Sequence, residues 1–234
     1  MLEAKQLTKR YGEKLALDSL DLQIAPGEVY CLVGANGAGK TTTISLFLNF
    51  ISPTSGNALV NDICIAEQPE LANRHMAYIP ETVSLYGQLS GIENLDYFST
   101  LAGYRLSQKE KLDLLERAGL RADDAKRRAG QYSKGMRQKV GIATALAKNA
   151  TAILMDEPTS GLDPQASNEF SQLVKRLGNE KTIVLMATHD LYRAKDIATN
   201  IGIMRQGQLV ETVKPADVSH AELEQIALRN MQFQ

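Results

Sequence analysis

The chain has 234 residues, of which 44% are hydrophobic, and its 26 basic and 27 acidic side chains leave a net charge of −1. A chain of this size and composition is expected to bury a substantial core as one domain, which argues against a second full domain. The even charge balance argues against a nucleic-acid partner, because no bulk positive field attracts a phosphate backbone.

The cysteines and the hydropathy pattern bear on the compartment. Cys31 and Cys64 have the spacing of neither a disulfide framework nor a metal site, so a reducing cytoplasm is expected. No stretch approaches the roughly 18 consecutive apolar residues of a bilayer-spanning helix, and the start of the chain lacks the apolar core of a signal peptide. If the protein works on a membrane, a partner must supply the crossing.

The first half of the chain changes character twice. Up to Pro26-Gly27, apolar and polar residues alternate, which predicts half-buried antiparallel strands. Residues 29–33 indicate a strand buried on both faces, followed by a glycine-rich loop, a helix over 41–49 and a turn at 52–56. From about 89 to 129 helical spacing replaces the strand pattern, and we expect an inserted helical lobe at about 86–150.

The second half alternates strands and helices. Strands are expected at 152–155, 182–187, 201–204 and 208–213, and Asp163-Pro164 is typical of a helix start. Ser219 and Glu222 form a possible capping box for a last helix at about 219–231. This order predicts an α/β fold with a mainly parallel, doubly wound sheet and an N-terminal antiparallel β subdomain, within a single domain over 1–234.

The most specific motif lies between the strand at 29–33 and the helix that follows. Two glycines with four residues between them precede a lysine and a hydroxyl residue, the pattern of a P-loop NTPase. Its backbone N–H groups and helix N-terminus would surround phosphates, Lys40 would neutralise β- and γ-phosphate oxygens, and Thr41 would hold Mg²⁺. A glycine-rich turn with an exposed lysine is the plainer alternative. The expected ATP-binding residues of this loop are Gly34, Ala35, Asn36, Gly37, Ala38, Gly39, Lys40, Thr41 and Thr42.

Two further strands end in polar side chains. Asp156 and Glu157 follow the strand at 152–155, at the sheet edge where ligands of α/β proteins lie. Asp156 suits Mg²⁺ and Glu157 suits a general base that activates water. His189 follows the strand at 182–187 and would contact the γ-phosphate or orient the water at that edge. Without the phosphate loop, a solvent-facing acidic pair and a structural histidine would be the simpler interpretations.

Together these residues closely resemble the ATP-binding subunits of ATP-binding cassette (ABC) transporters, over nearly the whole chain. The most discriminating element is residues 132–138 (YSKGMRQ), which resemble the family's signature and which we call the signature segment. The resemblance implies that Ser133 and Gly135 contact the γ-phosphate held by the opposite subunit. It also implies that Asp163 lies in the subunit contact and that Tyr11 stacks on adenine. Taken alone, Ser133 is an ordinary helix cap and Tyr11 a half-buried strand residue.

The sequence departs from the family pattern at two places. The signature segment has Lys134 and Met136 where the commonest pattern has Gly and Gln, and Glu81 stands where most members have the Gln that touches Mg²⁺ and senses the permease. Glu81 is still a possible Mg²⁺ ligand, although it adds negative charge beside a triphosphate. Both variants are similar to the subgroup whose permease is a separate polypeptide and which mostly exports.

The resemblance therefore implies an ATP-hydrolysing subunit that uses ATP and Mg²⁺, pairs with a second copy as a homodimer, and drives an integral-membrane permease from the cytoplasmic face of the cell (inner) membrane. Two alternatives stay open at this point. One is a soluble ABC-type ATPase in macromolecular or cluster assembly, and the other is a phosphoryl transferase using the same loop. Cargo and direction of transport are not encoded in such a subunit, because specificity lies in the permease.

Overall fold

Two sheets organise the computed structural model, which describes residues 1–232. Antiparallel pairing joins a four-stranded sheet in the order β2-β1-β4-β5, made of β1 (Leu2–Tyr11), β2 (Lys14–Ile24), β4 (Ser55–Val60) and β5 (Ile63–Cys64). A six-stranded sheet has the order β10-β9-β3-β8-β7-β6, made of β3 (Val29–Val33), β6 (Met76–Ile79), β7 (Ala152–Asp156), β8 (Ile183–Thr188), β9 (Asn200–Arg205) and β10 (Gln208–Val213). Its pairs are parallel except β9–β10, so the predicted parallel sheet with an antiparallel β subdomain is confirmed.

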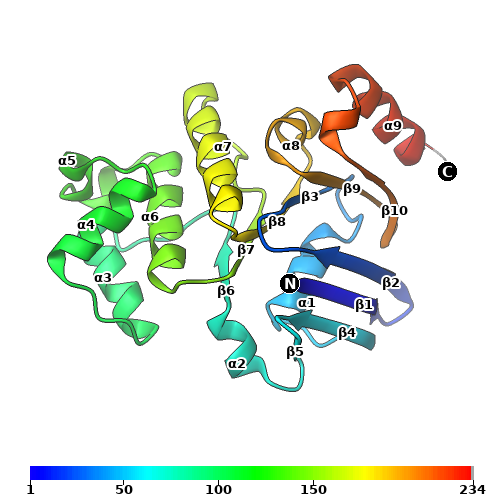
Figure 1. Ribbon diagram of the computed structural model, residues 1–234, viewed down its shortest axis with the longest axis horizontal. Helices are drawn as coiled ribbons and strands as arrows, with labels where there is room; N and C mark the ends of the chain where they lie inside the picture. The colour runs from blue at the N-terminus through cyan, green and yellow to red at the C-terminus, as the bar shows by residue number, and fades with distance from the viewer. Residues whose placement is uncertain (233–234) are drawn as a thin grey trace.

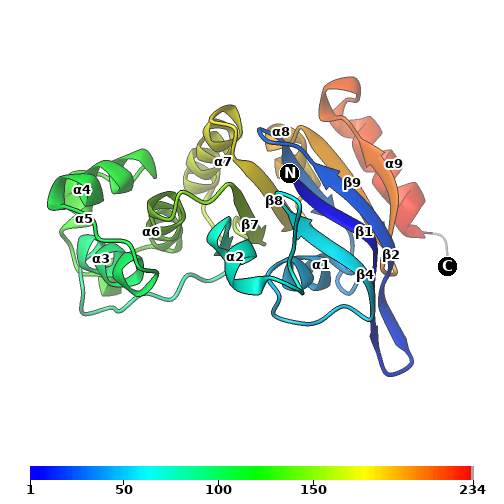
Figure 2. The ribbon, with the colours of Figure 1, turned by 60° about the horizontal axis from the view of Figure 1, so that its bottom comes forward.

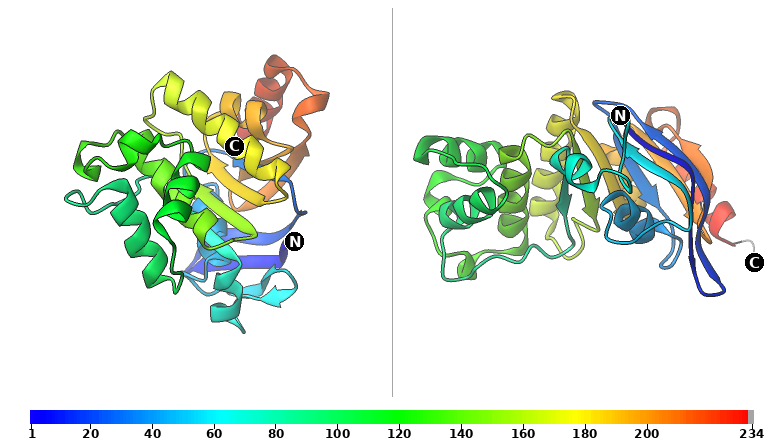
Figure 3. Two further views of the ribbon diagram at one scale, coloured as in Figure 1. Left: turned by 60° about the vertical axis from the view of Figure 1, so that its left-hand side comes forward. Right: turned by 90° about the horizontal axis from the view of Figure 1, so that it is seen from below.

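The helices divide between the faces of the larger sheet and a separate lobe (Figure 1). Helices α1 (Lys40–Phe47), α2 (Pro69–Arg74), α7 (Pro164–Asn179), α8 (Leu191–Ile197) and α9 (His220–Gln232) accompany the sheets. The lobe holds α3 (Gly91–Leu101), α4 (Gln108–Arg117), α5 (Ala122–Ala125) and α6 (Lys134–Ala147). Short 3-10 turns lie at Ala129–Gln131 and Pro215–Asp217. Figure 3 shows the lobe at one end of the molecule, away from β1 and β2.

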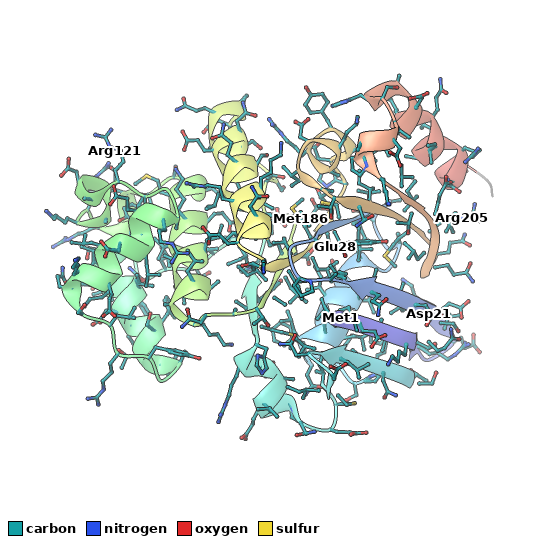
Figure 4. All side chains as sticks on the ribbon, viewed as in Figure 1. Met1, Asp21, Glu28, Arg121, Met186 and Arg205 are labelled. Carbon is teal, nitrogen blue, oxygen red and sulfur yellow. The ribbon has the colours of Figure 1, made fainter. Side chains whose placement is uncertain are left out.

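Two hydrophobic clusters lie on opposite faces of the six-stranded sheet. One places α1, with the fully buried Phe47, between this sheet and the antiparallel sheet, as the tilted view in Figure 2 shows. The other joins α6, α7, α8 and α9 to the opposite face and continues into the helical lobe. Met186 of β8 lies in the middle of the molecule, whereas Arg121 and Arg205 mark its two ends (Figure 4). Because both faces are covered, β3 is buried at every position, as its apolar run predicts.

Three helices begin with the same reciprocal cap. In α3 and α4, the serine side chain accepts from the N3 backbone N–H and the N3 glutamate accepts from the serine N–H. At α9, Ser219 N–H donates to Glu222 at 2.7 Å, and Glu222 N–H donates to the Ser219 hydroxyl at 3.2 Å. The predicted start of the last helix is therefore confirmed. Within residues 1–232 no helix is both long and apolar enough to span a bilayer.

The segment between α1 and the lobe differs most from expectation. Gly56, expected to end a turn, lies inside β4, because pairing with β1 brings its α-carbon against the Gln6 carbonyl, where only glycine fits. Tyr78 and Ile79, for which no strand was predicted, belong to β6, which pairs with its parallel partner β7. Long-range pairing, which local patterns do not encode, fixes both elements.

Candidate functional site

The glycine-rich loop runs from the end of β3 to the first turn of α1, as its motif predicts. A side chain at Gly34 would collide with the Met204 carbonyl of the neighbouring strand β9. Gly39 forms the N-cap of α1 with a left-handed φ of 109°, and an added Cβ there would lie 2.9 Å from the Ala16 carbonyl oxygen. Glycine is therefore required at both positions, and the loop turns tightly enough to present N–H groups to an anion.

Lys40 lies inside this loop. Its Nζ donates to the Gly34 carbonyl at 2.7 Å and to the Ala35 carbonyl at 3.2 Å, and the residue is 6% exposed. Burial lowers the Lys40 pKa, while the carboxylates of Glu157 and Asp156 raise it. The ammonium is thus held among carbonyls and carboxylates, where a polyanionic ligand would supply a stronger counter-charge.

Thr41 and Asp156 meet across the sheet edge. The Thr41 hydroxyl donates to Asp156 Oδ1 at 3.3 Å. Burial raises the Asp156 pKa, the Thr41 hydrogen bond and Lys40 lower it, and the charges of Glu157 and Glu81 raise it further. A carboxylate in this setting is stabilised by a cation, and a hydroxyl beside a carboxylate is the donor set that holds Mg²⁺ together with substrate phosphates. Among the described residues, no three His, Cys, Asp or Glu side chains gather into a cage of their own.

Glu157 and His189 are in direct contact. His189 Nδ1 lies 2.9 Å from Glu157 Oε1, and the Thr188 hydroxyl donates to Glu157 Oε2 at 3.3 Å. The contact forms because β7 and β8 are parallel neighbours whose carboxyl ends reach the same edge. Glu157 has a left-handed φ of 46°, which is uncommon for a non-glycine residue, and its N–H donates to the Ala187 carbonyl at 2.9 Å. The Glu157 residue lines the same cavity as the phosphate loop.

A cavity of about 230 Å³ brings these elements together with the antiparallel sheet. Tyr11 is 48% exposed at the end of β1, and Lys9 Nζ lies 4.9 Å from the centre of its ring. Sequence reasoning missed Lys14 and Ala16, which reach the cavity because the β1–β2 hairpin pairs Tyr11 with Lys14. The spacing of the hairpin is the signal that would have found them. The cavity is lined by Tyr11, Lys14, Ala16, Asn36, Gly37, Gly39, Lys40, Thr41, Thr42 and Glu157.

The predicted subunit-contact residues lie elsewhere. Ser133 caps α6 by accepting from Met136 N–H at 3.3 Å, and Asp163 caps α7 by accepting from Ala166 N–H at 2.9 Å. Gly135 lets the two helix starts approach, since an added Cβ would lie 3.2 Å from the Ala166 Cβ. The structure thus brings Ser133, Gly135 and Asp163 together at the starts of α6 and α7, and none of them lines the phosphate-loop cavity.

Glu81 follows β6 and faces a different partner from the one expected. Its side chain is 55% exposed, and Oε1 lies 3.6 Å from Lys134 Nζ of the signature segment. Within residues 1–232 no hydrogen bond or ion pair joins it to Thr41 or Asp156, so its role as a Mg²⁺ ligand stays a prediction.

Comparison with known proteins supplies the family. The family described as ABC transporter matches residues 17–160. The linearmycin resistance ATP-binding protein LnrL of Bacillus subtilis is 32% identical over 212 residues, which are 90% of this chain and 68% of that protein. The bacitracin transport ATP-binding protein BcrA of Bacillus licheniformis is 33% identical over 215 residues, covering 91% and 69%. The probable multidrug ABC transporter ATP-binding protein YbhF of Escherichia coli is 32% identical over 93% of this chain, which spans only 38% of YbhF.

Solved structures agree with the sequence matches. An ATP-binding subunit of an ABC transporter superposes with a TM-score of 0.82 at 30% identity, over 97% of this chain and 99% of that one. The dimeric ATP-binding cassette MJ0796, in a post-hydrolysis state bound to ADP and Pi, gives a TM-score of 0.79 at 28% identity, over 92% and 99%. The predicted family and fold are confirmed: the chain belongs to the ABC transporter family, as an ATP-binding and ATP-hydrolysing subunit.

Proposed function

We propose that this chain hydrolyses Mg-ATP in the phosphate-loop cavity and uses the reaction to drive export through a separate membrane permease. The observation that carries the proposal is the convergence of a buried lysine, the Thr41–Asp156 pair and the Glu157–His189 pair on one cavity edge. A binding loop alone would serve many ligands. Hydrolysis also requires a general base beside the loop.

Each group then has one task. The loop N–H groups of residues 34–42 and the Lys40 ammonium bind the β- and γ-phosphates, and Tyr11 stacks on the adenine. Thr41, Asp156 and Glu81 would hold Mg²⁺, which would supply charge neutralisation on the phosphate oxygens. Glu157 accepts a proton from the attacking water. His189 holds the Glu157 carboxylate through the 2.9 Å contact and turns its exposed ring towards the γ-phosphate position.

A second copy of the chain completes the site. Ser133, Gly135 and Asp163 lie outside the cavity of their own chain, where they cap helices whose N-termini attract anions. Two copies arranged head to tail would bring these N-termini to the phosphate held by the partner. The structure of the relative MJ0796 is dimeric, which supports the pairing of two copies.

The permease partner fits the helical lobe. A hollow of about 460 Å³ lies where α3 and α6 meet the segment after β6, and its lining includes Val83, Leu85, Phe98 and Ala145. Beside it Tyr86, Tyr97 and Leu101 are exposed. An apolar hollow rimmed by aromatics suits an amphipathic segment of an integral-membrane protein, which would place this chain on the cytoplasmic face of the cell membrane. Relatives named for bacitracin transport and linearmycin resistance support an exporter of antibiotic-like compounds.

The decisive test is ATP hydrolysis by the purified chain, with Lys40→Ala as the variant. The wild type should retain ATP in the presence of Mg²⁺ and release phosphate without any acceptor, and Lys40→Ala should lose both properties. Equal ATP retention by Lys40→Ala would refute the assignment of the loop. A matched control is Lys5→Ala, which removes an exposed cation that pairs with Glu3 at 3.0 Å outside the cavity and should leave phosphate release within about twofold, as for most surface changes.

Copurification decides the partner. A tagged chain expressed in its own cell should bring down an integral-membrane protein, and Val83→Glu in the hollow should lose that partner while keeping ATPase activity. Recovery of only soluble assembly factors would support the alternative of a soluble ABC-type ATPase.

A further inference from the structure

An acidic and a basic side chain from distant parts of the chain touch each other. Glu81 lies in the segment after β6, and Lys134 lies in the signature segment. Although 53 positions separate them, Lys134 Nζ lies 3.6 Å from Glu81 Oε1. A carboxylate and an ammonium therefore face each other at the start of α6.

The backbone around Glu81 is held from the same helix, one turn further along. Gln138 is fully buried, and its Nε2 donates to the Pro80 carbonyl at 3.1 Å and to the Glu81 carbonyl at 3.0 Å. Residues 134 and 138 are four apart and so share one face of α6. Helix α6 therefore contacts the segment at two points, through the backbone by Gln138 and through the side chain by Lys134.

Glu81 lies at the same sheet edge as the phosphate-loop cavity. Strands β6 and β7 are parallel neighbours with Ile79 opposite Met155, so Glu81 follows β6 at the edge where β7 ends in Asp156 and is followed by Glu157. Three carboxylates therefore gather at the edge of a site that, under the proposed function, accepts a polyanion. A further cation beside Glu81 reduces this repulsion.

Lys134 is placed to provide that cation. Its side chain is 27% exposed, so the stem is partly packed, and an added Cβ on Gly161 would lie 3.9 Å from its Nζ. The ammonium thus lies between the segment after β6 and the loop 160–163 that precedes α7.

We propose that Lys134 is a positioning residue that neutralises Glu81 and, together with Gln138, clamps residues 80–81 to the start of α6. The clamp joins the segment next to the nucleotide to the segment predicted to meet the partner's nucleotide, so the two move as one body. This inference deepens the proposed function and rests on it for the nucleotide part only.

A double-mutant cycle tests the clamp in the nucleotide-free chain. Hydrogen exchange of residues 81–86 is measured in wild type, Lys134→Met, Glu81→Gln and the double variant. Lys134→Met should speed exchange by up to about fivefold, the range expected for an exposed ion pair, and should add nothing once Glu81→Gln is present. The exchanged pair Lys134→Glu with Glu81→Lys should restore slow exchange, and so should Lys134→Arg. The control is Lys111→Met, which removes another lobe ion pair, 2.9 Å from Asp96, and should leave residues 81–86 unchanged.

ATP affinity of the same four proteins tests the charge. Lys134→Met should weaken Mg-ATP binding by about three- to fivefold when Glu81 is present, and it should have no effect on binding in the Glu81→Gln variant. Equal effects of Lys134→Met with and without Glu81→Gln, in either measurement, would overturn the proposal. If none of the four proteins binds ATP, the proposed function fails while the exchange measurement still decides the clamp.

Discussion

The phosphate-loop cavity is lined by side chains from three separated stretches of the chain, 11–16, 36–42 and 157. The signature segment and Asp163, in contrast, lie at the first turns of two neighbouring helices, α6 and α7. In the cavity, polar groups face one another: Lys40 contacts carbonyls, Thr41 contacts Asp156 and His189 contacts Glu157. The side chains of Ser133 and Asp163 each cap only their own helix, α6 or α7. Under the proposed function, the first region is a site assembled within one chain, and the second is a half-site whose helix N-termini complete the site of a second copy.

The largest expected effect is that of replacing the general base Glu157 in the phosphate-loop cavity. Glu157→Gln should lower the rate of ATP hydrolysis by about 10²- to 10⁴-fold, the range of general-base catalysis, because the amide cannot accept a proton from water. ATP binding should persist, and the unreacted nucleotide should trap a dimer that size-exclusion chromatography detects. His189→Ala, which removes the partner at 2.9 Å, is the companion variant and should bind ATP with a lesser loss of rate. Wild-type hydrolysis by Glu157→Gln would remove Glu157 from the mechanism.

Mixing two inactive chains sharpens the contrast between site and half-site. Lys40→Ala damages the loop and Ser133→Arg damages the signature segment, so each homodimer should be inactive. Random pairing makes half of the dimers mixed, each with one intact composite site, so the mixture should recover about a quarter of wild-type activity. The measurement is phosphate release after the subunits exchange. Mixed dimers that form without any recovery would show that the signature segment acts within its own chain.

Substitutions of Tyr11 test the part of the cavity lining that the antiparallel sheet contributes. Tyr11→Ala should weaken ATP binding by about tenfold, within the range of base–aromatic stacking, whereas Tyr11→Phe should bind like wild type because the ring is what stacks. Fluorescence titration with an ATP analogue measures both. A loss in Tyr11→Phe as large as in Tyr11→Ala would point to the hydroxyl group instead of stacking.

Local patterns predicted the elements whose residues carry their own signal. The buried run at 29–33, the Asp163-Pro164 helix start and the Ser219–Glu222 cap all lie where the sequence indicates. The alternation of strands and helices likewise gave the parallel sheet, and with it the approach of Glu157 to His189. These features depend on neighbours in sequence or on the general rule that parallel strands end at one edge.

Features that depend on register were beyond the sequence. Lys14 enters the cavity through a particular hairpin pairing, and β6 forms only against β7. The contact between Glu81 and Lys134 was not predictable from the sequence, because it joins the segment after β6 to the first residue of α6. No pattern of spacing reports which of several charged surface residues meet across a gap of fifty positions.

The smallest expected effect is on thermal stability, and it again distinguishes the phosphate-loop cavity from the start of α7. Burial raises the Asp156 pKa, so ionising this group favours the unfolded chain. The stabilising contribution of Asp156 is therefore present below its ordinary pKa and is lost as pH rises through the folded value. At neutral pH, Asp156→Asn should raise the melting temperature of the nucleotide-free chain by roughly 2–4 °C, the shift given by about 1 kcal/mol at this size, and the gain should shrink in acid.

Asp163→Asn is the matched control for this change. Asp163 caps α7 at the signature end, where it accepts from Ala166 N–H at 2.9 Å, and asparagine caps a helix about as well as aspartate does. Its melting temperature should therefore stay within about 1 °C of wild type, since the cap is retained. Thermal melts of both variants from pH 4 to pH 8 give the comparison. Equal shifts in the two variants would mean that the charge of Asp156 destabilises the folded chain no more than the charge of Asp163 does. A shift confined to Asp156→Asn would show that the phosphate-loop cavity, unlike the start of α7, contains a carboxylate whose charge lowers the stability of the ligand-free chain.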